Sequence, residues 1–116
     1  MMEPLCYVIV LLDISIVINY IFIMIKSFNS GETEKIWEGD FAKGYPGDIQ
    51  NIARKKLRML NNSYDLSDLR VPPSNRLKKL KSGRKGQFSI RINNQWRIRF
   101  IWKNNDCYGV EITDYH

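Results

Sequence analysis

The last three residues of the chain, Asp114, Tyr115 and His116, bring an acid, a phenol and an imidazole together at the C-terminus. His116 is the only histidine in the sequence, and imidazole is the side chain that most readily carries a proton near neutral pH. A frayed terminus is the alternative interpretation, because terminal residues are usually disordered unless other contacts hold them. The chemistry available here therefore depends on whether an element of structure reaches the end of the chain.

A run of basic residues precedes this tripeptide. Between Leu69 and Asn105 there is no acid, and there are eleven bases. They are Arg70, Arg76, Lys78, Lys79, Lys81, Arg84, Lys85, Arg91, Arg97, Arg99 and Lys103. From residue 24 onward the chain has 18 bases and 10 acids, a net charge of +8. Such an excess favours a polyanionic partner such as nucleic acid or the ribosome, although any single lysine could equally be a solvated surface charge.

These residue types suit the cleavage of RNA by its own 2′-hydroxyl. That reaction requires a base for the hydroxyl proton, fixed cations for the charge on phosphorus and an acid for the leaving 5′-oxygen, and no metal or cofactor is obligatory. The residues predicted to meet the phosphate are Arg91, Arg97, Lys78, Lys81 and Arg84. Gly83 and Gly86 would let the loop approach a phosphate closely, whereas the spacing of a P-loop is absent.

Two helices and a turn are predicted before the basic run. Ser30 can cap a short helix that runs to Trp37, with acids in its first turn. From Asp48 to Leu60, apolar residues recur at helical spacing, and this pattern predicts the main helix. Residues 65–69 are expected to form one further turn, because the two prolines that follow impose extended chain.

From Phe88 onward the period of the apolar residues changes to two, which predicts three strands in an antiparallel meander. A two-residue loop after the first of these strands would mix apolar and basic side chains on each face. A three-residue loop over 93–95 instead pairs Ile92 with Trp96 and Phe88 with Phe100, so that the two faces separate. We therefore expect the three-residue loop.

The same register, carried across residues 103–107, pairs Phe100 with Val110 and Arg99 with Glu111. The apolar face must then be covered by the helices. The other face is expected to carry Arg91, Arg97, Arg99, Glu111 and Thr113, exposed to a ligand, with Tyr115 continuing the alternation if the strand reaches the end of the chain.

The N-terminal segment differs in composition from the rest of the chain. Residues 5–25 contain no base and one acid, Asp13. A stretch of this length can span a bilayer, although Asp13 would cost roughly 3 kcal/mol on insertion scales. The alternatives are an upstream extension before a natural start at Met24 and an additional core element. From Met24 the sequence MIKSF predicts a short first strand.

The cysteines add little to this picture. Cys6 and Cys107 have neither metal-binding spacing nor a disulfide pattern, which indicates a reduced, cytoplasmic chain. The expected organisation is an apolar extension over residues 1–23, followed by one domain over residues 24–116.

The run RLKKLKSGRKGQFSIRINNQWRIRFIWKNNDCYGVEITDYH, together with the MIKSF start, closely resembles the HigB family of bacterial toxin–antitoxin systems, within the RelE-like superfamily. The resemblance implies a compact α/β (α+β) fold in which two N-terminal helices pack on one face of an antiparallel sheet. It also implies a metal-independent mRNA interferase that cleaves translated mRNA on the ribosome and thereby inhibits translation and growth. The implied partners are a helix-turn-helix, HigA-like antitoxin, mRNA and the 70S ribosome, with no small-molecule cofactor.

The resemblance also assigns roles to residues. The implied catalytic residues are Lys81, Arg97, Asp114, Tyr115 and His116, and the implied RNA-binding residues are Lys78, Lys79, Arg84, Lys85, Arg91 and Arg99. Some members carry a histidine where this chain has Lys78, so His116 with Lys78 would have to cover the acid and base roles.

Two other functions stay open on the sequence. A non-nucleolytic toxin of the same superfamily would bind a protein target such as DNA gyrase. A membrane-anchored basic protein would use residues 5–25 as its span and the basic run for anionic lipid.

Overall fold

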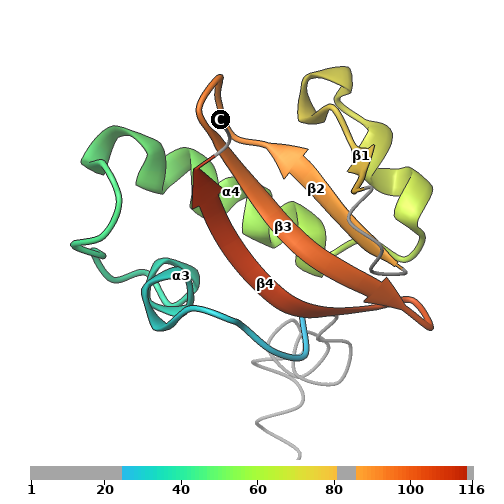
Figure 1. Cartoon of the computed structure of the whole chain (residues 1–116), viewed down its shortest axis with the longest axis horizontal. Helices are drawn as coiled ribbons and strands as arrows, with labels where there is room; N and C mark the ends of the chain where they lie inside the picture. Colours follow the sequence, from blue (N-terminus) through green and yellow to red (C-terminus); the bar gives the residue numbers. More distant parts are fainter. Residues whose placement is uncertain (1–24, 81–85, 115–116) are drawn as a thin grey trace, which may run out of the picture.

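The computed structural model describes residues 25–80 and 86–114 (Figure 1). A four-stranded antiparallel sheet in the order β1-β2-β3-β4 forms its centre. The strands are β1 Lys78–Lys79, β2 Gln87–Arg91, β3 Trp96–Lys103 and β4 Asp106–Asp114. With two helices, α3 Gly31–Trp37 and α4 Gly47–Asn61, they form the predicted α+β fold.

The helices follow the predicted boundaries closely. The Ser30 Oγ caps α3 by accepting a hydrogen bond of 3.2 Å from the backbone N–H of Thr33. Helix α4 begins at Gly47, one residue before the predicted start. The turn predicted over residues 65–69 is a 3₁₀ helix, η1 Leu66–Arg70, and a second one, η2 Pro73–Asn75, precedes β1.

The helices cover the apolar face of the sheet, with α4 behind it and α3 beside β4 (Figure 1). The core joins Ile36 of α3 and Leu57 of α4 to Phe100 of β3, all three fully buried. Full burial of a side chain such as Phe100 contributes roughly 1.5–3 kcal/mol. Cys107 lies in the same core, where burial and then the charge of Asp106 raise the pKa of its thiol.

The pairing of β2 with β3 is the predicted one. Phe88 faces Phe100, and the ring centroids of the two side chains lie 6.2 Å apart. The backbone N–H of Ile92 donates to the carbonyl of Trp96 at 2.9 Å, which closes a three-residue loop over 93–95. The register that separates the apolar from the polar face is therefore confirmed for this hairpin.

The pairing of β3 with β4 follows the prediction only in part. Arg99 faces Glu111 as predicted, but the register shifts by one residue between Arg99 and Ile101, so that Ile101 faces Tyr108. The predicted pair of Phe100 with Val110 coincides with this β-bulge. A bulge adds an unpaired residue to one strand and increases its local twist.

The cause of the shift lies in the connection between these strands. Asn104 and Asn105 form a two-residue turn with φ angles of 53° and 64°, where a five-residue loop was expected. Asparagine tolerates this left-handed region better than most residues. Gly109, with φ of 59°, then absorbs the extra residue at a point where a Cβ would lie 3.1 Å from the Asn29 amide.

Residues 25–28 extend the sheet beyond β4. Ile25 and Phe28 form isolated parallel bridges with Cys107 and Val110, so the predicted short first strand is present as two bridges and not as a continuous strand. The N–H of Ile25 also donates to Asn61 Oδ1 at 3.2 Å, which ties this segment to the end of α4.

Several predictions concern residues outside the described part of the chain. They are the N-terminal extension over 1–23 with the start at Met24, and the site residues Lys81, Arg84, Lys85, Tyr115 and His116. Within residues 25–80 and 86–114, no helix is both long and apolar enough to cross a membrane.

Candidate nucleic-acid interface

Alternation along the strands gives the sheet a second, polar surface opposite to the core. Two cross-strand rows lie on it. One row contains Lys78, Ser89, Arg99 and Glu111, and the other contains Arg91, Arg97 and Thr113. We call these seven residues the polar face. The register therefore brings four of the predicted site residues together, and their contact with RNA stays a prediction.

Lys79 lies apart from this group. It pairs with Phe88, whereas its neighbour Lys78 pairs with Ser89, so the two lysines lie on opposite sides of β1. Both are exposed. Of the two, only Lys78 belongs to the polar face.

Arg97 differs from the expectation of an open cation, because only 7% of it is exposed. Its Nε donates to Ser89 Oγ at 2.8 Å, and its Nη2 donates to the carbonyls of Arg76 at 2.6 Å and Ser89 at 3.2 Å. The predicted exposure of Arg97 is thus wrong. Its guanidinium holds the segment before β1 against the middle of the sheet. This contact is strong, because hydrogen bonds from a charged donor are stronger than neutral ones.

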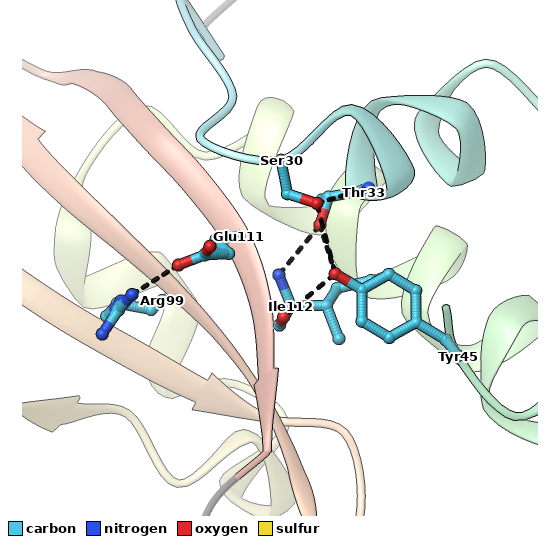
Figure 2. Close-up of polar contacts among 6 residues, drawn as sticks. All are labelled: Ser30, Thr33, Tyr45, Arg99, Glu111 and Ile112. Carbon is cyan, nitrogen blue, oxygen red and sulfur yellow. Dashed lines mark hydrogen bonds and ion pairs between the residues drawn. The ribbon is translucent and has the colours of Figure 1, made fainter. Parts of the chain in front are cut away.

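Arg99 and Glu111 form an ion pair across β3 and β4 (Figure 2). Their side chains are 39% and 25% exposed, so the pair is open to solvent and to ligands. This pair was predicted from the register. Because an exposed pair contributes little to stability, a phosphate can compete with Glu111 for the guanidinium.

Arg91 lies close to a cation that the sequence analysis did not single out. Burial and then the charge of Arg91 lower the pKa of Lys56, whose ammonium donates to Asn75 Oδ1. Arg91 itself donates through Nη2 to Asn94 Oδ1 at 2.6 Å. The charge of Arg91 on β2 thus acts on Lys56 of α4, although the two residues are far apart in the sequence. No sequence pattern distinguished Lys56, because it is one of several basic residues in the predicted main helix.

Asp114 lies at the end of β4, opposite Trp96, and its Oδ2 accepts a hydrogen bond of 3.1 Å from Gln95 Nε2. Alternation places it on the side of the sheet away from Arg97 and Thr113. It is exposed, and it is the last residue that the structure describes. Strand β4 therefore continues to within two residues of the C-terminus, which opposes the interpretation of a frayed strand up to Asp114.

The two ends of the predicted site lie at opposite ends of β3. Gly86, where the β1–β2 connection re-enters the described chain, bonds through its carbonyl to the N–H of Trp102 at 2.8 Å. Asp114 lies opposite Trp96 instead. Trp102 lies six positions after Trp96 along the strand, a distance of about 20 Å. The polar face lies between these two ends, but Asp114 lies on the other side of the sheet, so contact of one ligand with both ends stays a prediction.

Gly86 has a structural reason to be glycine. Its φ is 77°, and a Cβ there would lie 3.0 Å from the carbonyl oxygen of Trp102. Both facts exclude a larger residue without strain. The close approach observed at Gly86 is thus to β3, and approach of this loop to a phosphate stays a prediction.

The sheet, its cationic polar face and the two helices on the other side define a toxin fold of the RelE-like class. The protein-family model for the RelE-like toxin of the type II toxin–antitoxin system HigB matches residues 26–116. The chain belongs to this HigB-like family. It is 36% identical over 93 residues to Toxin HigB-1 of Vibrio cholerae, which covers 79% of this chain and 94% of that protein.

The name of a second relative includes an enzymatic activity. The chain is 29% identical over 93 residues to Endoribonuclease HigB of Proteus vulgaris, covering 80% of this chain and 100% of that protein. Family membership implies an antitoxin partner for the present chain.

Proposed function

We propose that this toxin is a ribosome-dependent endoribonuclease that cuts translated mRNA and so inhibits translation and growth. The observation that carries the proposal is the polar face, on which cations from three strands lie in register. A row of fixed cations suits a phosphodiester backbone. The name of the Proteus vulgaris relative supports the same activity.

The proposed reaction is attack by the ribose 2′-oxygen on the adjacent phosphorus. The 2′-hydroxyl gives its proton to a base, the new bond to phosphorus forms, and the bond to the 5′-oxygen breaks as that oxygen takes a proton from an acid. His116, with Asp114 or Tyr115, is proposed to carry the protons. Lys81 and Arg97 are proposed to act on the charge that develops at phosphorus, without a metal or cofactor.

The contacts of Arg97 refine its part in this proposal. With Nε and Nη2 donating to Ser89 and Arg76, the guanidinium acts on a phosphate through its field and through the segment it holds, which leads to Lys81. Direct binding of the RNA backbone is assigned to Lys78, which is exposed, and to Arg91 and Arg99, which are partly exposed, together with Arg84 and Lys85.

The proposed partners follow from the activity and the family. They are mRNA on the 70S ribosome in the cytoplasm, and a helix-turn-helix, HigA-like antitoxin that restrains the toxin. Lys79, on the other side of β1, is proposed to contact ribosomal RNA and not the message lying on the polar face.

The test is cleavage of mRNA on translating ribosomes, followed by primer extension. His116→Ala and Tyr115→Phe should each lower the cleavage rate by about 100-fold, the lower range for loss of general acid–base catalysis. Lys43→Gln, which removes an exposed cation from the loop between the helices, serves as the control and should cleave normally. Growth arrest that persists undiminished in the His116 and Tyr115 variants would instead indicate a non-nucleolytic toxin with a protein target.

A further inference from the structure

Strand β4 has an outer edge that backbone pairing covers only in part. The N–H and C=O of Val110 pair with Ser27 and Asn29, at 3.0 Å each. The next outward-facing backbone groups belong to Ile112, beyond the reach of this segment. An uncovered edge at this point would leave the end of β4 paired with β3 alone.

At Ile112, side chains replace backbone groups as the hydrogen-bonding partners of β4. Its N–H donates to Thr33 Oγ1 at 3.0 Å, and its carbonyl accepts a hydrogen bond of 3.1 Å from the hydroxyl of Tyr45. The two hydroxyls lie 3.1 Å apart (Figure 2). One backbone residue of β4 is thus held on both of its polar groups by side chains from α3 and from the loop that precedes α4.

The protons fix the direction of every bond in this ring. The single proton of the Tyr45 hydroxyl goes to the Ile112 carbonyl, so the Thr33 hydroxyl must donate to the Tyr45 oxygen. The lone pair of Thr33 accepts the Ile112 N–H. All donors run head to tail, an arrangement in which hydrogen bonds strengthen one another. We call the ring of Thr33, Tyr45 and the Ile112 backbone the β4 clamp.

Tyr45 is itself held from two sides. The side chain of Gln50, buried in α4, donates to the carbonyls of Ala42 at 2.7 Å and Tyr45 at 2.9 Å and accepts the Ala42 N–H at 3.0 Å. The Tyr45 ring meets Trp96 edge-on, with the centroids 5.5 Å apart. Trp96 is the cross-strand neighbour of Asp114, so Tyr45 contacts β3 near its start and β4 near its end.

We propose that Thr33 and Tyr45 are positioning residues for the C-terminal tripeptide. The clamp fixes β4 at Ile112, two residues before Asp114, and so holds the described end of the strand in place. This inference rests on the proposed function, in which Asp114, Tyr115 and His116 handle protons. A small displacement of catalytic groups costs rate far more than it costs binding, because reaction needs tighter geometry than contact does.

The experiment compares hydroxyl deletions in the full-length protein. Tyr45→Phe and Thr33→Val break the clamp, whereas Thr33→Ser keeps the hydroxyl and should restore wild-type behaviour. Ser63→Ala is the matched control, because it removes a buried hydroxyl that donates to the Met59 carbonyl at 2.8 Å, after the end of α4. We expect the two clamp variants to cleave about tenfold more slowly under single-turnover conditions, with unchanged affinity for the programmed ribosome.

Two further readouts do not depend on activity. Exchange of the Ile112 amide proton should accelerate in Thr33→Val. The NMR signal of His116, the single histidine, should shift in both clamp variants and stay in place in Thr33→Ser and Ser63→Ala. If Thr33→Val fails to fold, Tyr45→Phe at its partly exposed site carries the same comparison.

The outcomes separate the clamp from the proposed function. A wild-type protein that cleaves no RNA contradicts the proposed function, and the exchange and histidine signals then decide the clamp alone. Wild-type cleavage with an equally fast Tyr45→Phe variant and an unshifted histidine overturns the clamp. A Ser63→Ala variant that slows as much as Tyr45→Phe also overturns it, since general loss of stability would then explain both.

Discussion

Glu111 is an acid on a face whose other charged side chains are cations. It holds the Arg99 guanidinium, which is one of the groups proposed to meet the RNA backbone. An RNA phosphate that binds Arg99 would therefore compete with this carboxylate for the guanidinium. We therefore expect the pair to weaken nonspecific binding of RNA and to favour a ligand with the correct geometry.

The change Glu111→Gln tests this competition. We expect the affinity for a short single-stranded RNA to rise about two- to fivefold, because an exposed ion pair of this kind is worth up to about 1 kcal/mol. The dependence of log K on log salt should steepen by roughly one contact. Fluorescence anisotropy over a range of KCl measures both. Glu32→Gln, at an acid paired with Lys35 on α3, is the control, and equal effects of the two changes would refute the role of Glu111.

Arg97 allows a second prediction at the scale of the single residue. Arg97→Lys keeps the charge but loses the planar fork that reaches Ser89 and Arg76, and it should lower the free energy of unfolding by about 1–3 kcal/mol. Urea denaturation measures the loss. A variant that keeps full stability and yet loses cleavage would show that Arg97 acts on the phosphate directly.

The sequence predicted the side of the sheet for Arg97 but not its burial. Strand alternation determines the face, whereas burial depends on the carbonyl of Arg76, which lies in a segment without any periodic pattern. Lys56 was missed for a related reason, since the charge of Arg91 that helps to lower its pKa comes from a strand far from Lys56 in the sequence. Contacts between segments that are far apart in the sequence cannot be predicted from a local residue pattern.

At the scale of elements, the β2–β3 hairpin was predictable, whereas the β3–β4 hairpin was predictable only in part. In the first, only a three-residue loop keeps Phe88 and Phe100 on one face, so the pattern decides the register. In the second, the turn at Asn104 and Asn105 and the bulge at Gly109 compensate each other. Arg99 meets Glu111 in both the predicted and the observed register, and the pattern therefore did not reveal the shift.

Asn105 tests the observed turn. With φ of 64°, this residue lies in the left-handed region, where a Cβ without a compensating side chain costs about 1–2 kcal/mol. Asn105→Ala should therefore destabilise the protein by about 1 kcal/mol, and Asn105→Gly should leave it as stable or stabilise it. Thermal unfolding measures both. Lys103→Ala, at the exposed neighbour in β3, is the control, and a five-residue loop in place of the turn would make all three changes neutral.

At the scale of the whole molecule, the sheet topology places several of the basic residues on one surface. The eighteen bases lie after residue 23, and the register gathers several of them on the surface that the helices leave uncovered. The stem of the β1–β2 connection and the end of β4 lie about 20 Å apart along the sheet. Sequence reasoning predicted that both belong to one site. The geometry places them at opposite ends of β3, and their contact with one ligand stays a prediction.

The contribution of residues 1–23 is the last property to test on the whole molecule. The family match begins at residue 26, and the core joins Ile25 to residues later in the chain. A chain that starts at Met24 should therefore keep the melting temperature of the full-length protein within about 2 °C and cleave mRNA at the same rate. Calorimetry and primer extension measure these two quantities. An inert or insoluble product would instead show that the apolar segment belongs to the folded core or anchors the protein, because exposed apolar surface left by a missing core element drives association.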